Sequence, residues 1–233
     1  MTLPQILPIT LSGFSQSDVA AVILLLVLSF GLSWIIDHPP EGRASVTVLM
    51  AQYRREWMRQ FVTRQPRIFD ATVLDSLRQG TAFFASACMI TLGGGIAVIG
   101  NSERLNSVAA DLTLTVEGAV LEIKILLVLI FVASALLKFI WAHRLFGYCA
   151  ILMAAVPNDP DTPGTYEAAA QAGEINITAA RSFNRGLRSI YFALGALGWL
   201  LGPEALIATT LMTALVLVRR EFASDSRKAI LRP

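Results

Sequence analysis

The sequence predicts an all-α fold: a polytopic membrane helical bundle with three full spans and a C-terminal segment broken by Gly-Pro, plus amphipathic cytoplasmic helices. Three apolar stretches, residues 19–36, 81–100 and 121–142, approach or exceed the about 20 residues that cross a hydrocarbon core of about 30 Å. Hydrophobic residues make up 55% of the 233-residue chain and charged residues 15%, against roughly 45–50% and 25% in soluble domains. The mean hydropathy of the chain is +0.59. We expect residues 1–233 to form a single transmembrane domain.

An amphipathic helix is expected between the first two spans, over residues 44–61. Apolar side chains recur there at three- and four-residue steps, which is one face of a helix. That face carries Trp57, and arginines such as Arg54 fall mostly elsewhere. The helix either lies on anionic headgroups or packs on the protein's own cytoplasmic side. Pro66 then breaks the chain, and a new helix is expected to run unbroken into the second span.

Small residues in the second span predict a helix–helix contact face. Gly93 and Gly94 are its centre, because small residues let the backbones of membrane helices approach closely. Gly198 and Gly202, four residues apart, predict another such face. The packing is either internal or between protomers.

Two lysines are the unusual polar residues of the third span. Lys124 is expected one turn inside its outer end and Lys138 near its inner end. One interpretation is that the two lysines snorkel to headgroups or form structural ion pairs. The other is that they mark a charged pathway along the span. Trp141 and Tyr148 share a face, and we expect them to pack against the cytoplasmic helix of residues 44–61. Lys138 is then expected to reach the headgroups or to pair with an acid such as Glu56.

The last apolar segment follows a turn-rich loop and a weakly amphipathic helical pattern from residue 165 to about 183. Pro203, directly after Gly202, interrupts it. One interpretation is a hairpin of two short helices, residues 186–201 and 204–219. The other is a single kinked helix, because proline is tolerated in membrane helices. We favour the hairpin, which returns the basic tail to the cytoplasmic side.

Lys and Arg counts predict the orientation. Seven arginines lie between the first two spans, whereas Arg104 is the only basic residue between the second and the third. The third loop and the C-terminal tail are basic again. The pattern predicts a multi-pass protein of the bacterial inner (cytoplasmic) membrane, with its N-terminus periplasmic and its C-terminus cytoplasmic.

Few chemical functions find support in the sequence. A formal charge of +2 gives no reason to expect nucleic acid. Cys88 and Cys149 lack metal-site spacing, and His38 and His143 are read as interfacial polar residues. The Gly93–Gly95 run lacks the Lys-Ser/Thr of a phosphate loop, and no catalytic motif is present. We therefore expect no catalytic residues, no metal and no cofactor.

Several runs resemble an uncharacterised bacterial membrane family with plant relatives, catalogued as domain of unknown function five-nine-nine. They are residues 54–58, 138–149, 151–157, 191–204 and 219–222. The resemblance covers about residues 20–222 and implies a multi-span inner-membrane protein with no assigned reaction. His143 stands where the family more often has Leu. The resemblance implies that these positions recur in the family: Arg54, Trp57, Lys138, Phe139, Trp141, Arg144, Tyr148 and Pro203.

The leading functional hypothesis is a non-enzymatic membrane protein that acts by association. Its expected partners are the lipid bilayer, with anionic headgroups at the cytoplasmic face, and a second copy or another membrane protein. The alternative is a small transporter or channel that uses the broken last segment and Lys138, because broken helices mark substrate sites in transporters. A membrane enzyme ranks third.

Overall fold

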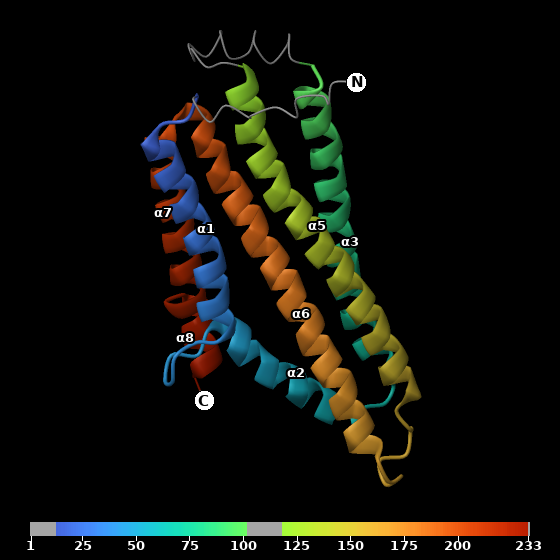
Figure 1. Cartoon of the computed structure of the whole chain (residues 1–233). Helices are drawn as coiled ribbons and strands as arrows, with labels where there is room; N and C mark the ends of the chain where they lie inside the picture. Colours follow the sequence, from blue (N-terminus) through green and yellow to red (C-terminus); the bar gives the residue numbers. More distant parts are fainter. Residues whose placement is uncertain (1–12, 102–117, 233) are drawn as a thin grey trace, which may run out of the picture.

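The computed structural model describes residues 13–101 and 118–232, and within them the chain is helical and contains no strand (Figure 1). The predicted loop between the second and third spans and most of the N-terminal lead-in lie outside the described residues. In chain order the elements are α1 (Gln16–Asp37), α2 (Val46–Thr63), α3 (Ile68–Ile99), α5 (Gly118–Ala155), α6 (Thr165–Ala196), the 3₁₀ helix η2 (Leu197–Leu201), α7 (Pro203–Phe222) and α8 (Asp225–Leu231).

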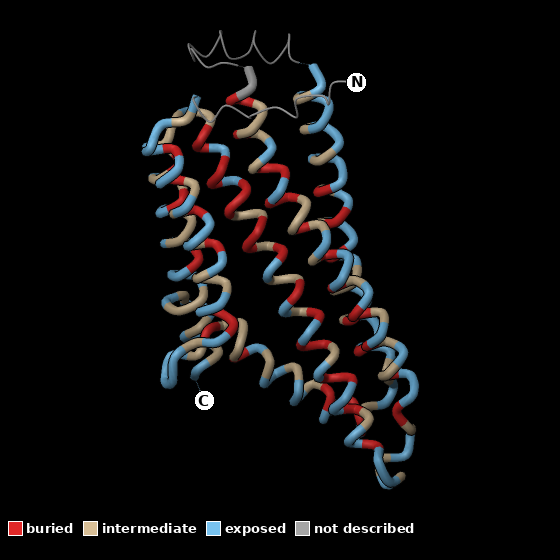
Figure 2. The backbone as a smooth tube through the Cα atoms, viewed as in Figure 1, coloured by how far each residue is buried: buried red, intermediate tan, exposed pale blue. Residues whose placement is uncertain are grey.

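Helix α6 lies at the centre of the bundle. It packs against α5 along most of its length and also contacts α2, α7 and α1, while α3 packs mainly against α5 (Figure 1). Buried residues follow α6 from end to end, whereas α1, α3 and α7 are buried on a narrower side (Figure 2). The bundle therefore depends on α6, although its sequence is less apolar than those of α1 and α5.

Helices α1, α3, α5, α6 and α7 follow the long axis, and α2 and α8 lie where α1 ends (Figure 1). The loop after α1, helix α2, the α5–α6 turn and α8 lie on this side. We call it the basic end, because α2 carries Arg54, Arg55 and Arg59 and α8 carries Arg227 and Lys228. The lower parts of α3, α5 and α6 extend beyond the end of α1 and enclose a second core with α2, which includes Met58, Phe146 and Met153. The other core surrounds Phe139 and Phe192.

Helix α2 confirms the expected amphipathic helix, and its buried face overlaps the expected apolar face at Leu49 and Phe61. Ser45 caps it by accepting a hydrogen bond from the Val48 amide (3.2 Å), and the Ser45 hydroxyl donates to the Ile36 carbonyl (2.7 Å). These bonds fix the angle between α1 and α2. Met58 and Val62 are buried, whereas Tyr53 is exposed and donates to the Ile230 carbonyl of α8 (3.2 Å).

The hairpin prediction is confirmed, and a single kinked helix is wrong. Gly202 takes a φ of +125°, which favours glycine, and Pro203 is the first residue of α7. A Cβ on Gly198 would meet Thr209 and lie 2.9 Å from the Ala205 carbonyl oxygen, so the predicted contact at Gly198 is real. The first arm is not a separate short helix: α6 runs unbroken from Thr165, because no proline interrupts it.

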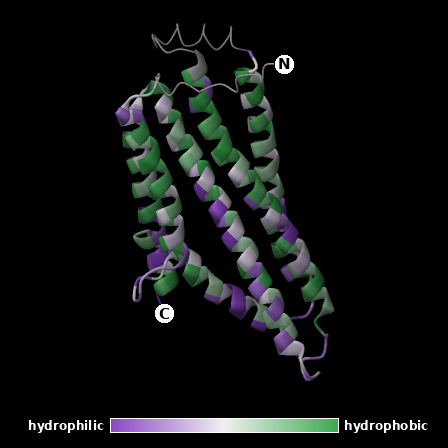
Figure 3. Cartoon of the chain, viewed as in Figure 1, coloured by the Kyte–Doolittle hydropathy of each residue, from purple (hydrophilic) through white to green (hydrophobic). Residues whose placement is uncertain are grey.

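Three helices are long and apolar enough to cross a membrane: Gln16–Asp37, Ile68–Ile99 and Val120–Ala155. Large apolar side chains on them face outward, including Phe30, Ile90 and Leu137. Hydrophilic residues are concentrated in α2 and the lower half of α6, beyond the apolar zone (Figure 3). The chain is a transmembrane helical bundle with an amphipathic extension at its basic end.

Candidate functional site: a cationic groove between α1, α5 and α6

The candidate site begins with a stripe of arginines on α6. Arg181, Arg185 and Arg188 follow one another at steps of four and three residues, which places them on one side of a helix. Gly186 of α6 packs against Phe139, where an added Cβ would lie 2.6 Å from the ring. Close packing of α6 on α5 therefore directs the arginine stripe toward α1 and α2.

Asp37, the last residue of α1, holds two of these arginines. Arg185 Nε donates to Asp37 Oδ2 (2.6 Å) and Arg188 Nη2 to Asp37 Oδ1 (2.9 Å). The Asp37 side chain is 2% exposed and that of Arg188 is 4% exposed, while Arg185 is 44% exposed. Arg188 Nε also donates to Ser33 Oγ (3.3 Å). Arg188 Nη1 is buried and has no hydrogen-bond partner among the described residues.

Lys138 brings a third cation to the same place from α5. Its Nζ donates to Ser134 Oγ (2.9 Å) and to Ser189 Oγ (2.6 Å). The lysine therefore turns into the bundle, and the expected snorkelling or pairing with Glu56 is wrong. Glu56 instead pairs with Arg59 (2.7 Å), which lowers the pKa of the Glu56 carboxyl to about 2. Hydroxyls hold Lys138 without neutralising its charge.

These groups line a groove of about 270 Å³ between the three helices. Helix α1 contributes Ser29, Ser33 and Asp37 at four-residue steps, and Phe131 and Phe192 form an apolar wall. Three formal cations, Lys138, Arg185 and Arg188, thus face the single carboxylate of Asp37. Burying charge without compensation is costly, so the groove has the electrostatic character of an anion site.

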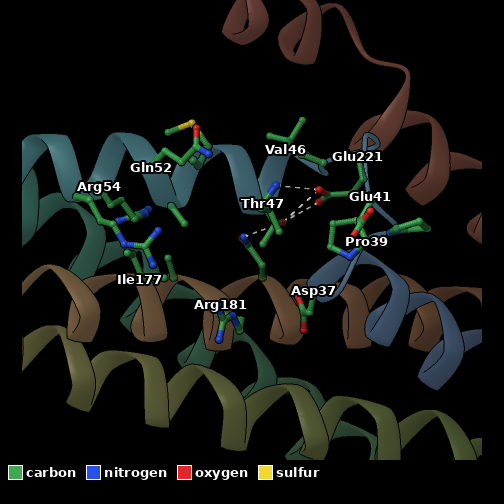
Figure 4. A pocket seen from close by; sticks show the side chains of 18 of the residues that line it. Asp37, Pro39, Glu41, Val46, Thr47, Gln52, Arg54, Ile177, Arg181 and Glu221 are labelled. Carbon is green, nitrogen blue, oxygen red and sulfur yellow. Dashed lines mark hydrogen bonds between the residues drawn. The ribbon is translucent and has the colours of Figure 1, made fainter.

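A larger vestibule of about 690 Å³ adjoins the groove at the basic end, beneath α2 (Figure 4). Arg181 and Arg54 line it, and the Thr47 amide and hydroxyl donate to the Glu221 carboxylate at its side (3.1 and 3.2 Å). Asp37 lines both the vestibule and the groove. The Asp37–arginine contacts therefore stand between the two spaces.

The two predicted site residues of α2, Arg54 and Trp57, hold α2 against its neighbouring helices and do not line the groove. Arg54 Nη1 donates to Asn176 Oδ1, and burial lowers the pKa of Arg54. Trp57 Nε1 donates to the buried carboxylate of Asp70 (2.6 Å). These contacts attach α2 to α6 and to the start of α3.

The prediction that Trp141 and Tyr148 pack against α2 is wrong. Trp141 is 49% exposed and Tyr148 is 39% exposed, and Arg144 Nε donates to the Tyr148 hydroxyl. Helix α2 approaches α5 with other residues, because Met58 and Phe61 turn toward Phe146.

Lys124 does not snorkel either. It is buried, and its Nζ lies 5.8 Å from the centroid of the Trp199 ring. Trp199 Nε1 donates to Asp18 Oδ1 (2.6 Å), so Lys124 belongs to a buried polar cluster at the end opposite the groove. The Gly202–Pro203 turn lies at that end as well (Figure 1). The broken segment and Lys138 therefore do not form one site.

Gly93 and Gly94 do not pack within the chain: nothing among the described residues comes within 4 Å of a Cβ added at either position. Gly95 makes the internal contact instead, against Leu129 of α5.

Three residues of the groove, Asp37, Arg185 and Arg188, are not among the site residues that the sequence predicts. The four- and three-residue spacing of Arg181, Arg185 and Arg188 is the signal in the sequence that indicates a shared face of α6.

A family model described as a protein of unknown function, DUF599, matches residues 20–226. The chain belongs to this family. Membership confirms the resemblance found in the sequence. No curated protein and no solved structure matches the chain, so the site stands on its own geometry.

We predict that Asp37→Asn lowers the free energy of unfolding by about 3–5 kcal/mol, because it leaves the buried Arg188 without its carboxylate. Asp225→Asn is the control, since Asp225 is exposed and pairs only with Lys228. Thermal unfolding in detergent measures both, and Asp37→Asn/Arg188→Gln should recover part of the loss. Identical melting of Asp37→Asn and wild type would refute the structural role of this pair.

Proposed function

We propose that this protein binds an anion in the groove between α1, α5 and α6 and passes it to the vestibule at the basic end, as a small transporter. The single observation that carries the proposal is the excess of cations around the groove: Lys138, Arg185 and Arg188 against Asp37. Ionisable residues inside a membrane bundle are costly and typically line substrate pathways. Binding and passage require no covalent chemistry, so the proposal is non-enzymatic.

The chemistry of the groove supports an anion rather than a cation. The Arg188 guanidinium is planar and offers Nη1, which is buried and unpartnered among the described residues. Lys138 has only neutral hydroxyl partners in those residues. An oxyanion between the two would accept from both and replace the missing countercharge.

Asp37 supplies the means of release. Its carboxylate already occupies Arg185 and Arg188 from the vestibule side. An anion on Arg188 Nη1 and Lys138 would share the Arg188 guanidinium with Asp37, and repulsion between the two negative charges would favour release of the anion. Three arginines and three carboxylates line the vestibule, so its formal charges balance and it would hold an anion less strongly than the groove does.

We predict that Lys138→Met reduces anion flux through proteoliposomes at least tenfold, because a neutral side chain removes one of the charges that face the groove. The measurement is release of trapped phosphate or chloride from vesicles that contain the purified full chain. Lys228→Met is the control, since Lys228 is an exposed lysine on α8 with Asp225 beside it.

Unchanged flux in Lys138→Met, or no flux above empty vesicles in wild type, would contradict the transport proposal. Circular dichroism of each variant separates loss of function from loss of fold. A near-native melting temperature is expected for Lys138→Met, since only two hydroxyl contacts are lost.

We further propose the bacterial inner membrane as the location, with the basic end in the cytoplasm. The fold brings the arginine-rich helix α2 and the basic α8 to one end (Figure 1), which supports the positive-inside assignment. Reporter fusions after Phe222 should be active only as cytoplasmic reporters. Activity of a periplasmic reporter at that position would reverse the orientation.

A second candidate function, association with a second copy or another membrane protein, is favoured by the open face of α3. Gly93 and Gly94 have no intramolecular neighbour among the described residues, and small residues suit close contact between helices. Gly94→Leu should therefore shift the particle to a smaller size in detergent while its fold is retained.

Gly31→Leu is the matched control, because Gly31 of α1 also has open space around it among the described residues. Size-exclusion chromatography with light scattering measures the mass of each particle. A Gly94→Leu particle with the wild-type mass would mean that this face of α3 contacts lipid.

A further inference from the structure

We propose that the anion held in the groove is the phosphate of an anionic phospholipid, whose acyl chains remain outside the protein beside α1 and α5. This inference rests on the anion site proposed above and names its substrate class. It requires three properties of the groove. The groove must open toward lipid, it must lie at the level of a headgroup layer, and its walls must change from apolar to cationic.

The groove opens on the lipid-facing side of α1. Phe30 and Trp34 line it, and they are 72% and 64% exposed on the outer surface of a helix that is apolar enough to cross a membrane. In a bilayer such side chains contact acyl chains. A ligand can therefore reach the groove sideways from the lipid without passing through the vestibule.

The groove lies at the level of one headgroup layer. Asp37 is the last residue of α1, and the chain leaves the apolar zone there for the basic end (Figure 3). Trp34 stacks on His38 at the same level, with ring centroids 5.6 Å apart, and tryptophans gather at membrane interfaces. Basic pockets between transmembrane helices at this depth are suited to lipid phosphate groups.

The walls of the groove match an amphiphile. Phe131 and Phe192, with ring centroids 6.4 Å apart, form its apolar part, and Lys138 and Arg188 form its polar part. With the phosphate at the polar part, the glycerol carbons of the lipid would contact this apolar wall on their way to the bilayer, and a free phosphate has no such group. Pockets that enclose a whole ligand measure about 300–1,000 Å³, so about 270 Å³ accommodates a headgroup whose chains stay in the bilayer.

Native mass spectrometry of the detergent-solubilised full chain tests this inference, with titrations of phosphatidic acid, phosphatidylcholine and inorganic phosphate. We expect at least tenfold tighter binding of phosphatidic acid than of phosphatidylcholine. The preference should fall at least fivefold in Lys138→Gln and persist in Lys138→Arg. Lys228→Gln, which changes an exposed lysine at the same end, should leave it unchanged.

Lipid that stays bound after extraction gives a second measurement, which needs no variant. At about 1 M salt the screening length is about 3 Å, which removes surface attraction but not a buried pair. Wild-type chain reconstituted in mixed vesicles and then extracted should retain phosphatidic acid at this salt concentration.

The outcomes separate the two proposals. Lys138-dependent binding of inorganic phosphate without preference for phosphatidic acid would overturn the lipid inference and keep the anion site. If the chain neither binds inorganic phosphate nor prefers phosphatidic acid, the anion site and the lipid inference are both overturned. Equal loss of lipid in Lys138→Gln and Lys228→Gln, or loss of retained lipid at high salt, would assign the lipid to the general positive surface and overturn the inference.

Discussion

The buried pair between Asp37 and Arg188 is the interaction on which the arrangement of the bundle's basic end depends. It joins the end of α1 to the middle of α6 with both side chains almost fully removed from water. Separating a pair of this kind leaves an uncompensated charge in a medium that solvates it poorly. The end of α1 is thereby fixed against α6, and the Ser45 hydroxyl, bonded to the Ile36 carbonyl, sets where α2 begins. The groove and the vestibule are the spaces left on either side of this junction.

Close packing of α6 on its neighbours complements this junction. Gly186 lies against Phe139 on α5, and Gly195 lies close to Thr209 and Thr213 of α7. A Cβ at either glycine would require its neighbours to move. Helix α6 can therefore stand between α5 and α7 while its remaining side faces α1 with charged residues. This explains how a helix with many polar residues occupies the centre of a membrane bundle.

Much of the fold was predictable, because its signals are local. Span lengths, the break at Pro66 and the turn at Gly202–Pro203 depend on hydropathy and backbone chemistry alone. The site was only partly predictable: Lys138 was identified, but its partners Ser134 and Ser189 depend on how α5 faces α6. Tertiary packing decides the direction in which Lys138 turns, and it also decides that none of the described residues packs beside Gly94. No periodicity within one helix could show that α1 and α6 place Asp37 beside Arg185 and Arg188.

A comparison of three buried carboxylates gives the reason for proposing the groove, rather than another polar cluster, as the functional site. Asp18 accepts from Trp199 and lies near Lys124, and Asp70 accepts from Trp57 and pairs with Arg64. Asp18 and Asp70 each have one cation beside them, and each links the ends of two helices. This structural role is sufficient to explain why these two carboxylates are buried. Asp37 alone among the three faces a surplus of cations. A structural link needs one arginine. The second, Arg185, is 44% exposed and is solvated by water, whereas Lys138 has only hydroxyl partners among the described residues. The anion that we propose would supply the charge that these hydroxyls do not.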